Sequence, residues 1–283
     1  MTAPREAQHT IQRNKALRLR ALHTPDPALV LANVWDAAGA RIVAAAGASA
    51  VATTSAGAAW ALGAPDGDAL PRERALELVA RVAASVDLPV TADIESGFGA
   101  APEDVAETVR GVLAAGAVGV NIEDAATEGP GPLRPAAEQA ERLRAAREAA
   151  DATGVPLFLN ARVDTYIREA GDPADRLRAT LERAEAYVAA GADGIFVPAV
   201  RDLPTVSALA AGLTVPLNVL AGPGSPPVAE LAAAGASRVS LGSSVAAAAY
   251  AVVRRAAEEA FSQGTYTSVS DALPYAELNA LLS

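Results

Sequence analysis

Three carboxylates and one arginine follow short apolar runs of this sequence. Asp93 and Glu95 stand in TADIESGFG, Glu123 in VNIEDA and Arg162 in LNARVD. Asp93 and Glu95 are two residues apart, so an extended strand would point both side chains to the same face. Carboxylate oxygens without cysteine or histidine partners suit a hard cation, Mg²⁺ or Mn²⁺, that keeps open positions for substrate oxygens. Arg162 would face them as a two-point clamp for a carboxylate or a phosphate.

A simpler role is open for each of these acids. An acid at the end of a strand can cap the following helix, and Asp124 or Asp164 could do only that. A buried arginine–carboxylate network without a metal is the alternative for the whole cluster. The spread of the cluster over three neighbouring strands favours the metal site.

The composition excludes several other chemistries. The 283 residues contain no cysteine, which rules out thiol catalysis and cysteine-ligated metals. The only histidines are His9 and His23 and the only lysine is Lys15, all in a polar N-terminal stretch, so we expect no histidine triad or Schiff base at the core. The net charge of −10 argues against a nucleic-acid partner. The N-terminus has no apolar targeting segment and no run is apolar enough to span a membrane, so we expect a cytoplasmic protein.

A repeated junction indicates which elements position these side chains. Ala-Ala-Gly-Ala occurs at residues 45–48, 114–117, 189–192 and 233–236. A short β-type run follows each copy, as expected where a helix ends on a glycine with positive φ and a strand begins. Prolines begin three further apolar runs, at Pro89, Pro156 and Pro216, and ALVLANV near Leu31 makes eight.

Eight strand–helix units in succession predict an α/β fold, a closed (β/α)8 barrel of the TIM type. A doubly wound open sheet is the alternative. The strands are mostly apolar rather than alternating, as expected for parallel strands covered on both faces. Between them, apolar residues recur at helical spacing, for example at Val105 and Val109. No linker divides the chain, so we expect one domain over residues 1–283, with a helical extension over 1–25 and C-terminal helices over 245–283.

The C-terminal region contains more helix than a barrel needs. Alanine-rich residues 245–261 and a short segment over 275–282 predict two helices after the eighth strand. A barrel uses one helix there. We therefore expect the surplus to pack on another subunit of a homo-oligomer.

Residues 33–66, with TADIESGFG, VNIEDA and LNARVDTY, resemble the isocitrate lyase/phosphoenolpyruvate mutase superfamily, and the resemblance covers roughly residues 32–251. It implies a (β/α)8 barrel whose last helix is swapped between subunits, commonly in tetramers built from dimers. The residues that match the family's Mg²⁺-binding acids are Asp93, Glu95 and Glu123. Those that match its catalytic positions are Asp66, an acid near the metal, and Arg162. Those that match its binding site for the 2-oxo acid are the amides of Thr54, Ser55 and Ala56, with Arg162 and Asn218.

Two features depart from that family. Glu95 replaces the aspartate usual in better-known members, which lengthens the arm by one methylene. The lyases carry a catalytic cysteine in the loop after the fourth strand and the mutases a lysine, whereas this chain has AATEGPGPL over residues 125–133. The Gly-Pro-Gly-Pro of this loop can form a turn and a lid, in which Glu128 is the one candidate acid.

The resemblance implies an enzyme, a Mg²⁺-dependent lyase or decarboxylase that acts on a small 2-oxo acid through a pyruvate enolate. We expect decarboxylation of oxaloacetate or a related acid rather than cleavage of isocitrate or methylisocitrate, because solvent can protonate the enolate once CO₂ has left. A mutase or hydrolase of carbon–phosphorus bonds is the second possibility, weakened by the absent lysine. A barrel that has lost catalysis and acts as a binding protein is the third.

Overall fold

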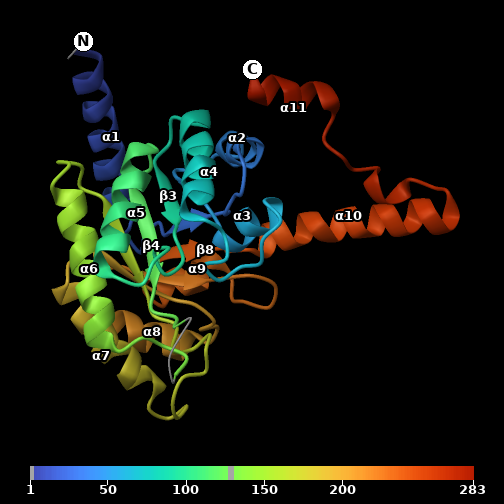
Figure 1. Cartoon of the computed structure of the whole chain (residues 1–283). Coiled ribbons are helices and arrows are strands. Elements are labelled where there is room, and N and C mark those ends of the chain that lie inside the picture. Colours follow the sequence, from blue (N-terminus) through green and yellow to red (C-terminus); the bar gives the residue numbers. More distant parts are fainter. Residues whose placement is uncertain (1–2, 127–130) are drawn as a thin grey trace.

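The computed structural model describes residues 3–126 and 131–283 (Figure 1). Its strands are β1 (Leu29–Leu31), β2 (Val51–Ala52), β3 (Val90–Asp93), β4 (Gly119–Glu123), β5 (Phe158–Arg162), β6 (Gly194–Val197), β7 (Leu217–Leu220) and β8 (Ala236–Ser240). Its helices are α1 (Ala3–Ala21), α2 (Ala37–Ala45), α3 (Ser55–Ala61), α4 (Arg72–Ser85), α5 (Pro102–Ala114), α6 (Ala136–Asp151), α7 (Arg176–Ala189), α8 (Leu203–Gly212), α9 (Val228–Ala233), α10 (Ser244–Gln263) and α11 (Tyr275–Leu282), with a 3₁₀ turn η1 (Thr267–Val269).

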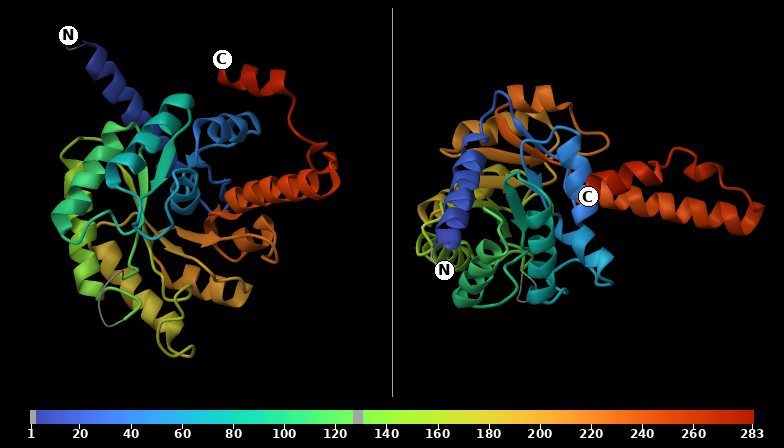
Figure 2. Two further views of the ribbon diagram at one scale, coloured as in Figure 1. Left: turned by 45° about the vertical axis from the view of Figure 1, so that its right-hand side comes forward. Right: turned by 90° about the horizontal axis from the view of Figure 1, so that it is seen from above.

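The parallel strands form one barrel with helices around it (Figure 2). Hydrogen-bonded neighbours run in the order β1, β8, β7, β6, β5, β4, β3 and β2. The two ends of this order meet in a parallel bridge between Val34 and Thr53, where Val34 N donates to Ala52 O over 2.9 Å. The predicted (β/α)8 barrel is therefore confirmed, and the doubly wound open sheet is wrong.

The four Ala-Ala-Gly-Ala junctions have the geometry that the sequence predicts. Their glycines are Gly47, Gly116, Gly191 and Gly235, with φ between +93° and +105°. A side chain at these positions would strain the backbone, so glycine allows each helix to turn directly into the next strand. These turns determine where the following strands begin. They thereby determine where those strands end and where the polar side chains at their ends lie.

The core lies between the barrel and its outer helices, and α1 packs at the N-terminal end of the strands. Val105 and Val109 on α5 are fully buried, as their spacing predicts. Leu19 on α1 lies beside Gly119, the first residue of β4. The imidazole of His23 stacks on Phe158, the first residue of β5, with the ring centroids 3.7 Å apart. The opposite end of the barrel, where the strands end, is left for the polar side chains.

Both predicted C-terminal helices are present, as α10 and α11. Helix α10 projects from the barrel, and the chain then returns so that α11 lies near α2 (Figures 1 and 2). Phe261 and Tyr275 on this arm are 90% and 85% exposed. A helix swap between subunits stays a prediction. Within the described residues, no helix is both long and apolar enough to cross a membrane.

Candidate active site

The ends of β3, β4 and β5 bring the predicted acids and arginine to one region. Strand register places Glu123 of β4 directly beside Arg162 of β5. Arg162 Nη1 lies 2.5 Å from Glu123 Oε2. On the other side of β4, Asp93 of β3 pairs in register with Asn121. Because parallel strands end at the same rim of the barrel, residues far apart in sequence become neighbours there.

Two carboxylates hold the guanidinium of Arg162. Besides the contact with Glu123, its Nε and Nη2 donate to the two oxygens of Asp164 over 2.6 and 3.0 Å. Burial opposes the charge of Arg162, but Glu123 and Asp164 outweigh that effect and raise its pKa. The arginine is therefore a fixed cation whose orientation is set from both sides.

Asp124 holds the backbone of Asp164, the acid that orients Arg162. Its Oδ1 accepts the N–H of Asp164 over 2.8 Å, while its Oδ2 accepts Tyr187 Oη at 2.7 Å and Arg183 Nη1 at 3.0 Å. Asp124 and Asp164 are both fully buried. Neither caps a helix, since the N-cap residues of α6 and α7 are Pro135 and Asp175. The helix-capping alternative is therefore wrong for both, and α7 is tied through Asp124 to the end of β5.

Asp93 is held by the first turn of α3. Its Oδ2 accepts Ser55 Oγ over 2.8 Å and Ser55 N over 3.2 Å. Thr54 N donates to Val34 O over 3.0 Å, and the Thr54 side chain caps α3. Of the three amides expected to receive a substrate carboxylate, those of Thr54 and Ser55 thus already have acceptors within the chain, whereas Ala56 follows them in the helix.

Glu95 uses its longer arm to reach the loop between α3 and α4. Its Oε2 accepts the N–H groups of Gly67, over 2.9 Å, and Asp68. The backbone at Glu95 has φ +51°, which few non-glycine residues adopt. Burial raises the pKa of Glu95 to about 7, and the charges of Asp68, Asp66 and Asp93 add to that rise. At the exposed rim, partial desolvation and the charge of Asp93 raise the pKa of Asp66.

Two of the predicted metal ligands, Asp93 and Glu95, act electrostatically on the third, Glu123. Burial raises the pKa of Glu123; Arg162 opposes the shift, and Asp93 and Glu95 add to it. Within residues 3–126 and 131–283, no three acidic or histidine side chains converge closely enough to hold a metal as they stand. The contacts described above use one oxygen of each of Asp93, Glu95 and Glu123. Each second oxygen is of the type that a hard divalent cation prefers, so the donor set fits such an ion.

Asn218 lies below the acids, in a polar layer inside the barrel. This interior polar layer consists of Asn121, Asn160, Asn218, Arg238 and Ser240, all at most 5% exposed. Asn160 Nδ2 donates to Asn121 Oδ1 over 2.9 Å and to Asn218 Oδ1 over 3.1 Å. Asn218 Nδ2 donates to Ser240 Oγ and to Arg238 O, each over 3.1 Å, and Arg238 Nη2 donates to Asn121 Oδ1 over 3.2 Å. Asn218 is thus held by hydrogen bonds within the interior polar layer, and its contact with a substrate stays a prediction.

Sequence reasoning missed several residues that support this site. Asn121 stands two residues before Glu123, and strand periodicity alone would have placed it on the same inward face. The same spacing relates Arg238 to Ser240 in β8. Arg183 and Tyr187 carried no comparable signal, because only the packing of α7 on the barrel brings them to Asp124.

The loop after β4 can be described only at its base. Ala125 and Leu133 form an antiparallel bridge, and Ala126 N donates to Pro132 O over 3.1 Å. The candidate acid Glu128 lies outside the described residues. The prediction that this loop forms a lid stays a prediction.

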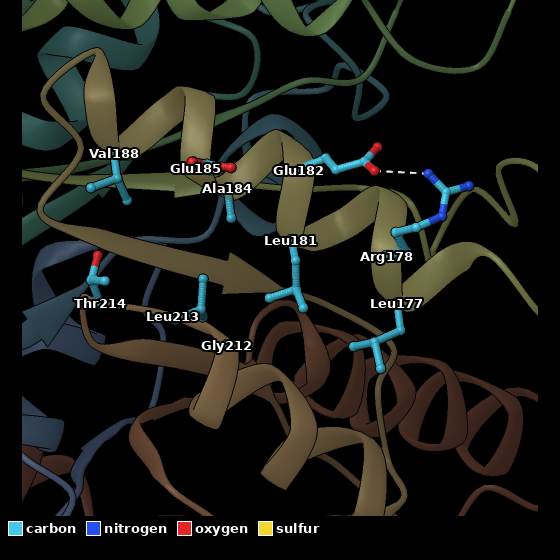
Figure 3. Close-up of a pocket in the computed structure, with 10 residues that line it drawn as sticks. All are labelled: Leu177, Arg178, Leu181, Glu182, Ala184, Glu185, Val188, Gly212, Leu213 and Thr214. Atoms are coloured by element: carbon cyan, nitrogen blue, oxygen red, sulfur yellow. Dashed lines mark hydrogen bonds and ion pairs between the residues drawn. The ribbon is translucent and has the colours of Figure 1, made fainter.

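A groove on the outside of the barrel lies away from these acids. It occupies about 590 Å³ on the outside of the barrel, between α7 and the end of α8, where Leu177, Leu181 and Leu213 line it (Figure 3). Its charged residues include Arg178 and Glu182, which pair with each other over 2.8 Å. We place the chemistry at the strand ends instead, because the perturbed acids and the fixed arginine are there.

Comparison with known proteins agrees with this architecture. A family model described as phosphoenolpyruvate phosphomutase matches residues 19–261. The crystal structure of a putative lyase/mutase from Burkholderia cenocepacia J2315 superposes with a TM-score of 0.89 and 41% identity, covering 95% of this chain and 96% of that one.

Two curated enzymes match over part of their length. The 2-methylisocitrate lyase of Escherichia coli (strain K12) is 34% identical over 56% of this chain and 53% of its own. The oxaloacetate decarboxylase of Rhodopseudomonas palustris (strain BisA53) is 36% identical over 57% of this chain and 54% of its own. The chain therefore spans about half the length of these two relatives. The family match covers most of the barrel, and the chain belongs to the phosphoenolpyruvate phosphomutase family of the isocitrate lyase/phosphoenolpyruvate mutase superfamily.

Proposed function

We propose that this protein is a divalent-metal-dependent lyase or decarboxylase that acts on a small 2-oxo acid of the oxaloacetate type. One observation carries the proposal: Glu123 lies against the fixed cation of Arg162 at the rim of the barrel, where burial and the charges of Asp93 and Glu95 raise its pKa. The named relatives, 2-methylisocitrate lyase and oxaloacetate decarboxylase, support the cleavage of carbon–carbon bonds as the reaction class.

Asp93, Glu95 and Glu123 would hold Mg²⁺ or Mn²⁺ through their second oxygens. Such a cation supplies Lewis-acid stabilisation of negative charge on the substrate's oxygens. Ser55 orients Asp93 through two hydrogen bonds. Asp66 stands at the rim with a raised pKa, which suits a carboxyl group that holds or passes a proton beside the substrate.

Arg162 and the first turn of α3 would bind the carboxylate of the 2-oxo acid. The guanidinium of Arg162 is a planar cation whose position Asp164 fixes, so the side chain loses little conformational entropy when an anion binds. Thr54, Ser55 and Ala56 lie at the positive end of α3. Asn218 would act from below, by keeping the interior polar layer in place under the substrate.

The reaction favoured here is decarboxylation. In oxaloacetate the bond between C3 and C4 breaks, C4 leaves as CO₂, and its electron pair forms the enolate of pyruvate. Solvent then supplies the proton at C3. Cleavage of an isocitrate-type substrate releases a 2-oxo acid together with the carbanion of a dicarboxylate, which a positioned acid must protonate, and this chain contains no cysteine for that task.

The test is turnover of oxaloacetate, 2-methylisocitrate and phosphonopyruvate by the purified chain, with Mg²⁺ or with a chelator. We expect Mg²⁺-dependent loss of oxaloacetate above the uncatalysed background, retained by Asp87→Asn and abolished by Asp93→Asn. Asp87 is an exposed acid that precedes β3 at the other end of the barrel, which makes it a matched control. Robust cleavage of 2-methylisocitrate, without Mg²⁺-dependent loss of oxaloacetate, would contradict the assignment.

A mutase or hydrolase of carbon–phosphorus bonds is the second candidate, favoured by the description of the matching family. The loop over residues 125–133 lacks the lysine expected for that chemistry. Conversion of phosphonopyruvate in the same assay would support this candidate. Absence of any turnover, with no calorimetric binding of Mg²⁺ plus oxalate, would support a binding protein without catalysis.

We also propose a homo-oligomer, a dimer or a tetramer, because α10 and the following segment expose Phe261 and Tyr275. Light scattering at micromolar concentration tests the oligomer, and a monomer would contradict it. The cytoplasmic location stays a prediction.

A further inference from the structure

A cavity of about 410 Å³ lies beside the acid cluster but outside the site assigned above. The start of α4 with the end of the loop before it, the loop after β3, and Arg134, two residues before α6, form its walls. The polar and aromatic side chains among its lining residues are Asp68, Arg72, Ser96, Phe98 and Arg134. Pockets of this size take small organic ligands.

Two largely buried arginines line this cavity. The side chains of Arg72 and Arg134 are 20% and 14% exposed. Arg72 pairs with Glu107 at 3.1 Å and with Glu73 at 3.7 Å, and Arg134 pairs with Glu138 at 2.9 Å. The side chains of these glutamates are 61%, 73% and 47% exposed. Water and salt screen these exposed carboxylates more than the largely buried guanidiniums, so that, beside Asp68, the guanidiniums of Arg72 and Arg134 are the charges that line the cavity.

A third arginine lies behind the cavity wall. Arg142 is fully buried, and among the described residues its acceptors are the backbone carbonyls of Ser96, Gly99 and Ala100. Burial, and then the charge of Arg134, lower the pKa of Arg142 to about 10, although the charges of Glu138, Asp68 and Asp104 oppose this shift. Carbonyl dipoles solvate a cation but do not neutralise it, so an anion in the cavity would offset this buried charge.

Unsatisfied donors point to the same conclusion. In the described part of the chain, the buried Nε atoms of Arg134 and Arg142 have no hydrogen-bond partner. Helix α4, with 14 residues, begins after Pro71 without a side-chain cap, and its first residue lines the cavity. The one acid in the wall, Asp68, is engaged by the amide and the hydroxyl of Ser96.

We propose that this cavity binds an oxyanion group, a carboxylate or a phosphate, between Arg72 and Arg134. Two guanidiniums and the positive end of α4 supply donors and charge of the kind that such a group needs. The group comes either from the far end of a substrate held at the acids or from a separate small anion. The binding claim does not depend on the reaction proposed above.

Titration of inorganic phosphate into the full-length protein without Mg²⁺, followed by calorimetry, tests the cavity itself. Arg134→Gln and Arg72→Gln should each weaken phosphate binding on the order of tenfold, because one charge-assisted contact is lost. Arg74→Gln is the matched control, since Arg74 lies on the same helix with a side chain that is 56% exposed and does not line this cavity. The Arg74→Gln protein should bind phosphate with the same affinity as the unaltered protein.

Either of two results would overturn the proposal: no phosphate binding at millimolar concentrations, or equal affinity in the Arg134→Gln, Arg72→Gln and Arg74→Gln proteins.

A competition experiment identifies the source of the group. It uses 2-oxobutyrate and the dicarboxylate 2-oxoglutarate in the presence of Mg²⁺. Displacement of phosphate by 2-oxoglutarate alone supports the far carboxylate of a substrate. Simultaneous binding of phosphate and both acids supports a separate small anion. Failure of the metal-dependent reaction would leave the phosphate result standing, so the two proposals fail separately.

Discussion

Acidification should destabilise the folded chain through His23, at the end of the barrel opposite the acids. His23 is 7% exposed, and its Nδ1 lies 2.8 Å from Leu19 O, so the neutral ring donates there. Its Nε2 is buried without a partner among the described residues. Burial, and then the charge of Arg238, lower the pKa of His23 to about 3. Protonation at Nε2 would place a cation in a site without an acceptor.

The size of the effect follows from proton linkage. An unfolded histidine has a pKa of 6.5, so between that value and about 3 the unfolded chain binds a proton that the folded chain does not. Stability is therefore fully present above pH 6.5 and is lost as the pH falls through this window. Near pH 5 the loss attributable to His23 is about 2 kcal/mol, from 1.36 kcal/mol for each of the roughly 1.5 pH units below the unfolded pKa.

The assay is urea unfolding at about pH 7.5 and about pH 5, at one fixed protein concentration. His23→Phe keeps a ring against Phe158 but cannot titrate. Its loss of unfolding free energy between the two pH values should be about 2 kcal/mol smaller than that of the unaltered chain, whatever its absolute stability. His9→Gln, which alters the exposed histidine of α1, should change nothing. An equal pH-dependent loss in His23→Phe and the unaltered chain would refute the reasoning.

Three further outcomes concern the acid cluster. Tyr187→Phe removes the hydroxyl that Asp124 accepts over 2.7 Å and should lower the free energy of unfolding by about 2 kcal/mol, measured with urea; an unchanged value would contradict the anchoring role. Arg162→Lys loses the two-point contact with Asp164 and should lower kcat/KM for oxaloacetate by a factor of about 30 or more, equivalent to about 2 kcal/mol; near-normal kinetics would make Arg162 structural. Asp93→Asn should keep the far-ultraviolet circular dichroism spectrum but lose calorimetric binding of Mg²⁺, and retained affinity would remove Asp93 from the metal site.

The barrel could be predicted from the sequence because its signals are local. Each Ala-Ala-Gly-Ala junction specifies a helix end and a strand start within a few residues, and Gly47 and Gly116 have the positive φ that this requires. Apolar strands imply helices on both faces. The convergence of Glu123 and Arg162 then follows, because parallel strands of a barrel end at one rim.

The partners of individual side chains could not be predicted in the same way. Glu95 accepts amides of the loop between α3 and α4, and this choice depends on where a distant loop comes to rest. The hydrogen bonds of Asn218 with Asn160 and Ser240 could not be predicted either, and its place beside the substrate stays a prediction. Such contacts arise from tertiary packing. The length of a side chain limits how far it can reach, but it does not determine which partner it contacts. The two-residue period of a strand would have placed Asn121 on the inward face of β4. It could not have identified Asn160 and Arg238 as the hydrogen-bond partners of Asn121.

The interior polar layer has a consequence for how this barrel can change. Asn121 Oδ1 accepts from both Asn160 and Arg238, so replacing Asn121 by an apolar residue removes the acceptor of a buried donor on each of the other two. Their substitution energies should therefore be strongly non-additive, with pairs tolerated better than either single change. Redesign of the barrel interior one position at a time would meet unstable intermediates. Simultaneous replacement of residues from β4, β5 and β8 would avoid these unstable intermediates, because every buried polar group has a hydrogen-bond partner both before and after the change.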